Sequence, residues 1–162
     1  MTNFFKERLK MLMKETLVQY QFTVEESDLN SGGILFGGRL MAILDNTMAS
    51  AAQTLTTARM VTGSVDTIRF MRPIDLGETI TIRAQVLQTK KRVAEVLAAV
   101  YNSRNKLTNY AVFTFVTVDK EVILPTIESQ TDIEELLQEN FENRVNTREK
   151  NAPTSIQITK KR

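Results

Sequence analysis

The feature that most constrains the fold is a long stretch, residues 39–58, that contains neither glycine nor proline and is rich in alanine, leucine and methionine. Such a composition favours a helix. One apolar stripe runs along this helix and consists of Met41, Leu44, Met48, Ala52 and Leu55. Further apolar residues extend it to most of the helix circumference: Leu40, Ile43, Ala49 and Ala51. A helix that is apolar on most sides must be covered by the rest of the chain.

The segments around this helix alternate with the period of two that is typical of strands. Strands are predicted over 16–25, 60–70, 78–89, 92–102 and 107–119. Turns are expected at 73–77 and 102–106, and strands joined in this way form an antiparallel sheet. We therefore expect an α+β fold in which a curved antiparallel sheet wraps around the long central helix. A sheet of this kind leaves an edge or a face open, which predicts a homo-oligomer.

The two ends of the chain carry shorter patterns. Residues 3–14 place apolar side chains at helical spacing, which predicts a short N-terminal helix in a domain that spans 1–125. A capping box at Thr131 and Glu134 opens a C-terminal helix, expected within 126–145. Residues 146–162 are polar and basic, and a disordered tail is predicted there.

Two absences restrict the chemistry. The chain has no cysteine and no histidine. Disulfides, thiolate–metal sites, cysteine nucleophiles and a Ser-His-Asp triad are therefore excluded. An enzyme built from this chain must use carboxylates, amides, hydroxyls, lysine or backbone N–H groups.

Charge and hydropathy limit the partners. The net charge of +2 does not predict a nucleic-acid surface. No apolar run approaches the roughly 20 residues that a membrane span needs. The N-terminus lacks the separate regions of a signal peptide, so a cytoplasmic location is expected.

Asp45 is the anomalous residue of the apolar helix, because it borders the buried stripe. A carboxylate in that position must be hydrogen-bonded, paired or put to use. Two interpretations are open. Asp45 is either a general base partly shielded from water or an aspartate that faces solvent from the open edge of the helix.

A glycine-rich segment, 28–38, directly precedes the helix. Gly37 and Gly38 would let a ligand approach the unpaired N–H groups of the first turn, where an oxyanion could be held. The alternative is a tight turn without a ligand. Asn30 could orient a water or a carbonyl group, or could be an ordinary turn residue.

These segments together resemble the hotdog-fold acyl-CoA thioesterases, the family that includes bacterial YkhA-like and brain-type enzymes. The resemblance rests on Asn30-x-x-Gly33-x-Leu-Phe-Gly-Gly38-x-x-x-x-x-x-Asp45, on Val61-Thr-Gly-Ser-Val-Asp66, on Phe70-x-x-Pro73-Ile-x-x-Gly77 and on Ala111-Val-Phe-Thr-Phe-Val-Thr-Val118. It covers about residues 16–125.

The resemblance implies hydrolysis of acyl-CoA to a free fatty acid and CoA, without a cofactor or metal. Asp45 would be the general base, Asn30 would orient the water or the thioester carbonyl, and the Gly38 N–H would polarise that carbonyl. Gly37 would lie against the substrate, and a hydroxyl of Thr62 or Ser64 would assist. Asn30 of one subunit would face Asp45 of another, in a dimer that assembles further into a trimer of dimers.

The sequence departs from the family at the basic triplet Lys90, Lys91 and Arg92, where many relatives carry a Gly-Arg-Thr-Ser-like sequence near the CoA nucleotide. The triplet could pair with the CoA phosphates, or it could be a solvated hairpin end. The acyl chain is expected to run beside Met41, Leu44 and Met48. The alternative functions are a non-catalytic module that binds or senses acyl-CoA and a purely structural oligomer.

Overall fold

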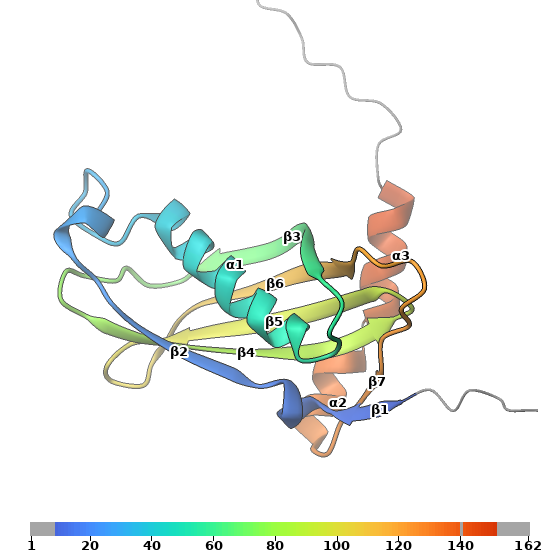
Figure 1. Ribbon diagram of the computed structural model, residues 1–162. Coiled ribbons are helices and arrows are strands. Elements are labelled where there is room, and N and C mark those ends of the chain that lie inside the picture. The colour runs from blue at the N-terminus through green and yellow to red at the C-terminus, as the bar shows by residue number, and fades with distance from the viewer. Residues whose placement is uncertain (1–8, 140, 152–162) are drawn as a thin grey trace, which may run out of the picture.

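The computed structural model describes residues 9–139 and 141–151. Its main element is a five-stranded antiparallel sheet in the order β2-β4-β5-β6-β3. The strands are β2 (Val18–Thr23), β3 (Met60–Phe70), β4 (Thr79–Lys90), β5 (Val93–Tyr101) and β6 (Leu107–Thr117). The sheet curves around one long helix, α1 (Gly37–Gln53) (Figure 1). The predicted α+β architecture is therefore confirmed.

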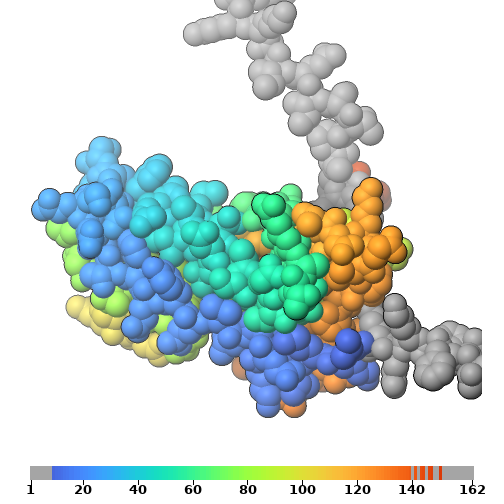
Figure 2. All heavy atoms as spheres, in the orientation of Figure 1, coloured from blue at the N-terminus to red at the C-terminus, as the bar shows by residue number. Residues whose placement is uncertain are grey.

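Helix α1 packs on the inner face of the sheet through the predicted apolar stripe. Leu44, Met48 and Ala52 are fully buried. The inner rows of the strands are equally apolar, and every member of the row on β4 is inaccessible to solvent: Ile80, Ile82, Ala84 and Val86. The opposite side of α1 is not covered by any other described part of the chain (Figure 2). Met41 lies on this uncovered side and is 37% exposed, so the stripe is narrower than the sequence predicted.

The predicted turns are present. Asn102 closes the β5–β6 hairpin, where its N–H donates to the Lys106 carbonyl at 2.9 Å, and Asn105 adopts the left-handed conformation with φ 56°. Gly77, with φ 80°, ends the turn before β4. Asparagine and glycine tolerate this region of the Ramachandran plot better than other residues do.

Strand β3 forms one edge of the sheet and contains two irregularities. Its register with β6 shifts between Thr62 and Ser64, and again between Val65 and Thr67. The extra residue at Gly63 is a β-bulge, which changes the face of the sheet to which the following side chains point. No strand of the described chain pairs with the outer edge of β3.

The N-terminal prediction was wrong in its described part. Residues Lys10–Leu12 form a short strand, β1, that pairs in parallel with β7 (Thr126–Glu128). A 3-10 helix follows at Met13–Thr16, in place of the predicted α-helix. Residues 3–8 of the predicted helix lie outside the described residues.

The C-terminal segment is divided differently from the prediction. It contains two helices, α2 (Asp132–Glu139) and α3 (Phe141–Asn151), and α3 extends into the region predicted as a tail. Half of the capping box is present, because Thr131 Oγ1 accepts a hydrogen bond from the Glu134 N–H at 3.2 Å. Residues 152–162 lie outside the described part. No helix within 9–139 or 141–151 is long and apolar enough to cross a membrane.

Candidate functional site

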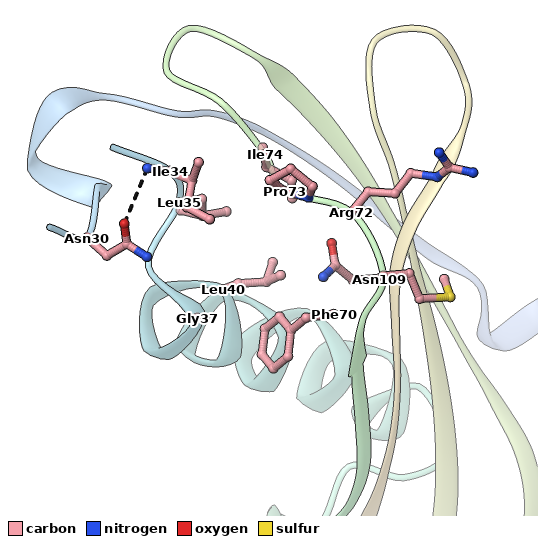
Figure 3. Close-up of a pocket in the computed structure, with 11 residues that line it drawn as sticks. Asn30, Ile34, Leu35, Gly37, Leu40, Phe70, Arg72, Pro73, Ile74 and Asn109 are labelled. Atoms are coloured by element: carbon pink, nitrogen blue, oxygen red, sulfur yellow. Dashed lines mark hydrogen bonds between the residues drawn. The ribbon is translucent and has the colours of Figure 1, made fainter. Parts of the chain in front are cut away.

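The loop before α1 is ordered around Asn30. Its side-chain Oδ1 accepts hydrogen bonds from the N–H groups of Gly32 at 2.9 Å and Ile34 at 3.3 Å (Figure 3). The Asn30 N–H donates to the Ile34 carbonyl at 2.8 Å, and Gly33 takes φ 78°. Asn30 is thus a turn residue, and its exposed Nδ2 group remains available to a ligand.

The first turn of α1 presents open N–H groups beside Asn30. The N–H groups of Arg39 and Leu40 both donate to the Phe36 carbonyl. Those of Gly37 and Gly38 have no acceptor within the described residues. A Cβ atom at Gly38 would lie 2.5 Å from the Phe36 ring, so glycine keeps this approach open. Two unpaired donors at the positive end of a helix dipole can hold a partial negative charge.

An ion pair between the buried Asp28 carboxylate and the exposed Arg39 guanidinium fixes this loop to the helix. Asp28 is 7% exposed and accepts hydrogen bonds from the Glu25 N–H at 2.9 Å and from Arg39 Nε at 2.8 Å. The Glu25 N–H and then the Arg39 guanidinium hold the pKa of the Asp28 carboxyl below its usual range. The Arg39 guanidinium also lies over the Phe22 ring at 5.2 Å. Sequence analysis missed this pair, which joins two residues eleven positions apart.

Asp45 lies in the middle of α1 and is half-buried. Its Oδ1 accepts a hydrogen bond from Thr62 Oγ1 at 2.6 Å. Its other oxygen accepts no hydrogen bond from the described residues. The carboxylate is therefore oriented on one side by Thr62 and can still accept a proton on the other.

Ser64, the second hydroxyl predicted to assist, does not contact Asp45 within the described subunit. The bulge at Gly63 places Thr62 opposite Phe115, on the inner face, and Ser64 opposite Thr114, on the outer face. Ser64 Oγ donates to Asp66 Oδ1 at 2.7 Å instead. Thr62 is thus the one of the two predicted hydroxyls that contacts Asp45.

A cavity of about 370 Å³ opens next to the start of α1. It is lined by Asn30, Ile34, Leu35, Gly37, Leu40, Phe70, Met71, Arg72, Pro73, Ile74 and Asn109. Asp45 is not among the lining residues. Met41, Leu44 and Met48 do not line it either, so the acyl path predicted beside them stays a prediction for the subunit interface. The predicted site residues therefore lie in two places: Asn30 with Gly37 at the cavity, and Asp45 with Thr62 further along α1.

The basic triplet lies at the β4–β5 turn, at the other end of the sheet from Asn30 (Figure 1). Lys91 is exposed and has φ 54°. Arg92 donates from its guanidinium to the Thr117 carbonyl at 2.8 Å, so part of its charge stabilises the fold. None of Lys90, Lys91 and Arg92 lines the cavity within the same subunit.

Comparison with known proteins assigns the family. Residues 32–108 match the profile described as Thioesterase superfamily. An uncharacterized acyl-CoA thioester hydrolase of Haemophilus influenzae is 30% identical over 122 residues, which cover 68% of this chain and 79% of that protein. This chain belongs to the acyl-CoA thioester hydrolases. The architecture of this hydrolase is the hotdog fold of that superfamily.

Solved structures similar to this hydrolase extend the comparison. The acyl-CoA hydrolase of Staphylococcus aureus, solved with butyryl coenzyme A, coenzyme A and coenzyme A disulfide, is 27% identical with a TM-score of 0.81 and covers 88% of this chain and 90% of that one. An apo-hexameric acyl-CoA thioesterase is 26% identical with a TM-score of 0.84 and covers 91% and 99%. Alanine variants of one asparagine, one aspartate and one threonine of the Staphylococcus aureus hydrolase have also been solved.

Proposed function

We propose that this hydrolase cleaves acyl-CoA to a free fatty acid and CoA, with Asp45 as the general base. The observation that carries the proposal is the state of the Asp45 carboxylate. It is half-buried, one oxygen accepts the Thr62 hydroxyl at 2.6 Å, and the other is open. A carboxylate held in one orientation with a free oxygen is suited to take a proton from water.

The comparisons support the same three residues. In the Staphylococcus aureus hydrolase, the asparagine, aspartate and threonine that were replaced by alanine are separated by 15 and 17 positions. Asn30, Asp45 and Thr62 have the same spacing in this chain. Agreement in residue type and in both intervals supports a common site.

The reaction follows from these positions. The thioester carbonyl oxygen lies against the Gly38 N–H, with Gly37 beside it, at the positive end of the α1 dipole. Asp45 removes a proton from a water whose oxygen attacks the carbonyl carbon, and the Asn30 Nδ2 group orients the water or the carbonyl. The tetrahedral intermediate then collapses, the C–S bond breaks, and the proton held by Asp45 passes to the departing CoA sulfur.

The site is completed between two subunits in this proposal. Asn30 and Gly37 share a cavity that Asp45 does not line, so a second copy is needed to bring the two parts together. Among the described residues, no strand pairs with the outer edge of β3, and two apolar side chains are exposed, Phe70 at the end of β3 at 54% and Phe36 before α1 at 56%. Antiparallel pairing of β3 with its copy would cover them. A trimer of such dimers is proposed, in line with the hexameric thioesterase.

The CoA nucleotide would approach the basic triplet. In this proposal Lys90, Lys91 and Arg92 contact the CoA phosphates, and Lys91 is the exposed residue of the three. Arg92 contributes less, because its guanidinium already donates to Thr117. The cytoplasmic location also stays a prediction.

The test is release of CoA thiol from acyl-CoA substrates of graded length by wild type and by Asp45→Asn. The chain has no cysteine, so a thiol-reactive chromophore reports only the product. Loss of the base is expected to lower kcat by about 10²- to 10⁴-fold. Asp119→Asn, at an exposed turn, is the matched control with unchanged activity. Full activity in Asp45→Asn would refute the role of Asp45, and binding of acyl-CoA by the wild type without turnover would favour the sensing module.

A further inference from the structure

Asn109 is a polar residue in an apolar row. It lies on the inner face of β6, in line with Ala111, Phe113 and Phe115. Its neighbours across the sheet are Phe70 on β3 and Val100 on β5. The side chain is 1% exposed, and its Oδ1 atom has no hydrogen-bond partner within the described part of the chain. Such groups are rare in folded proteins, because an unpaired buried acceptor is costly.

The carboxamide of Asn109 lies at the cavity beside α1 (Figure 3). The wall around it is mainly apolar, with Leu40 and Phe70 facing the same space. Asn30 lines the cavity as well, so the cavity connects the proposed reaction centre to Asn109. An acyl chain that starts at the thioester and enters this cavity passes along apolar side chains and meets one polar group.

The chemistry of that polar group selects its ligand. Oδ1 needs a hydrogen-bond donor, which an unsubstituted acyl chain does not have. A hydroxyl both donates and accepts, so it satisfies the carboxamide in either orientation of the amide. A carboxylate fits less well, because it could pair only with Nδ2 and would leave Oδ1 without a donor, and Figure 3 shows the Arg72 guanidinium turned away from Asn109.

We propose that Asn109 recognises a hydroxyl group on the acyl chain, so that this hydrolase prefers hydroxyacyl-CoA to unsubstituted acyl-CoA of the same length. The inference rests on the proposed function, since it assigns the substrate class of the same site. Asn109 is a specificity residue in this account, and the catalytic roles stay with Asp45, Asn30 and Gly38.

The experiment compares kcat/KM for paired substrates that differ only in a hydroxyl at C2, at C3 or at the terminal carbon. Wild type is expected to favour the hydroxylated substrate of at least one pair by about tenfold or more in kcat/KM. The reason is that the unsubstituted substrate would leave the buried Asn109 carboxamide without a hydrogen-bond partner. Asn109→Leu removes the carboxamide at similar size and should abolish or invert that preference. Asn109→Ala is the second variant if the leucine variant does not fold.

Thr108→Val is the matched control. Thr108 is the neighbouring residue on β6 and is also 1% exposed, but its hydroxyl donates to the Val100 carbonyl at 3.1 Å and it does not line the cavity. Its substitution should leave the substrate preference unchanged.

The outcomes separate this inference from the proposed function. The role of Asn109 is overturned if wild type hydrolyses acyl-CoA without preferring the hydroxylated substrate, or if wild type and Asn109→Leu show the same preference. An ordered water would then be the partner of Asn109. If wild type turns over no acyl-CoA, the proposed function fails. Calorimetric binding of each substrate pair then decides on Asn109, because a tenfold difference in Kd that Asn109→Leu removes would still support it.

Discussion

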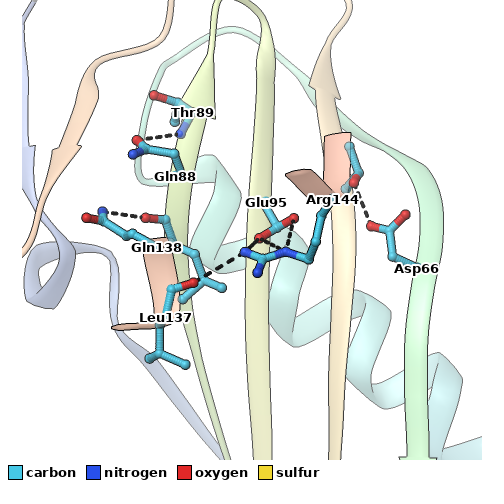
Figure 4. A network of polar contacts seen from close by, with 9 residues as sticks. Asp66, Gln88, Thr89, Glu95, Leu137, Gln138 and Arg144 are labelled. Carbon is cyan, nitrogen blue, oxygen red and sulfur yellow. Dashed lines mark hydrogen bonds and ion pairs between the residues drawn. The ribbon is translucent and has the colours of Figure 1, made fainter. Parts of the chain in front are cut away.

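The C-terminal helices are anchored by an ion pair that gives a quantitative prediction. Glu95, on the outer face of β5, is fully buried, while the Arg144 side chain on α3 is 36% exposed. Arg144 Nε lies 3.1 and 3.2 Å from the two Glu95 oxygens, its terminal nitrogen also contacts Oε1, and that nitrogen reaches the Leu137 carbonyl at 3.3 Å (Figure 4). Arg144→Met would keep the aliphatic length and remove the charge.

The expected loss is worked from the burial of the two partners. Breaking a fully buried ion pair by removing one partner costs about 3–5 kcal/mol. The Arg144 side chain is 36% exposed, so the pair is not fully removed from water and we expect about 2–3 kcal/mol. For a chain of this size that lowers Tm by about 4 to 12 °C.

The assay is thermal and urea unfolding at fixed protein concentration, since an oligomer gains stability from association. The double variant Glu95→Leu with Arg144→Met should recover most of the loss, because an apolar pair of similar volume avoids the desolvation of both charges. A Tm of Arg144→Met within about 1 °C of wild type would refute the reasoning. A double variant less stable than Arg144→Met would refute it equally.

The remaining predictions concern the site. Because the folded-state pKa of Asp28 is lowered, its stabilisation is present above the unfolded pKa of about 3.9 and is lost as the pH falls through the folded pKa. The free energy of unfolding, measured by urea titration from pH 6 to pH 2.5, should therefore fall less with acid in Asp28→Asn than in wild type. An equal fall in both proteins would contradict this. Thr62→Val removes the hydroxyl that orients Asp45 and should lower kcat by about tenfold with an intact fold by circular dichroism. Equal kcat in wild type and Thr62→Val would show that Asp45 needs no such support.

The central part of the fold was predictable because its signals are local and periodic. The stretch 39–58 reads as a buried helix from its own composition, and the predicted strand 60–70 agrees with β3 at both ends. The N-terminal segment was not predictable in this way. Lys10–Leu12 takes its conformation from pairing with Thr126–Glu128, a partner more than 100 positions away, and three residues carry too short a pattern to separate strand from helix.

The site was predictable in its residue types and less so in its geometry. Asp45 stood out as a carboxylate at the border of an apolar stripe, and Gly38 as the open start of a helix. Which of Thr62 and Ser64 faces Asp45 depends on the bulge at Gly63, which turns the side chains after it to the opposite face of the sheet. A bulge does not follow the period of two, so the sequence pattern does not reveal it. Asn109 was missed although its signal is present in the sequence, as the polar member of an alternating row that continues with Ala111 and Phe113.

The measurement that tests the central claim most directly is recovery of activity in mixtures of two inactive variants, Asn30→Ala and Asp45→Asn, refolded together. If one subunit supplies Asn30 and its partner supplies Asp45, each mixed dimer has one site with both native residues and one with neither. With random pairing in a two-fold dimer, the mixture should regain about one quarter of wild-type CoA release. If both residues act within one subunit, every site in the mixture carries a substitution, and activity no higher than that of the separate variants would contradict the account.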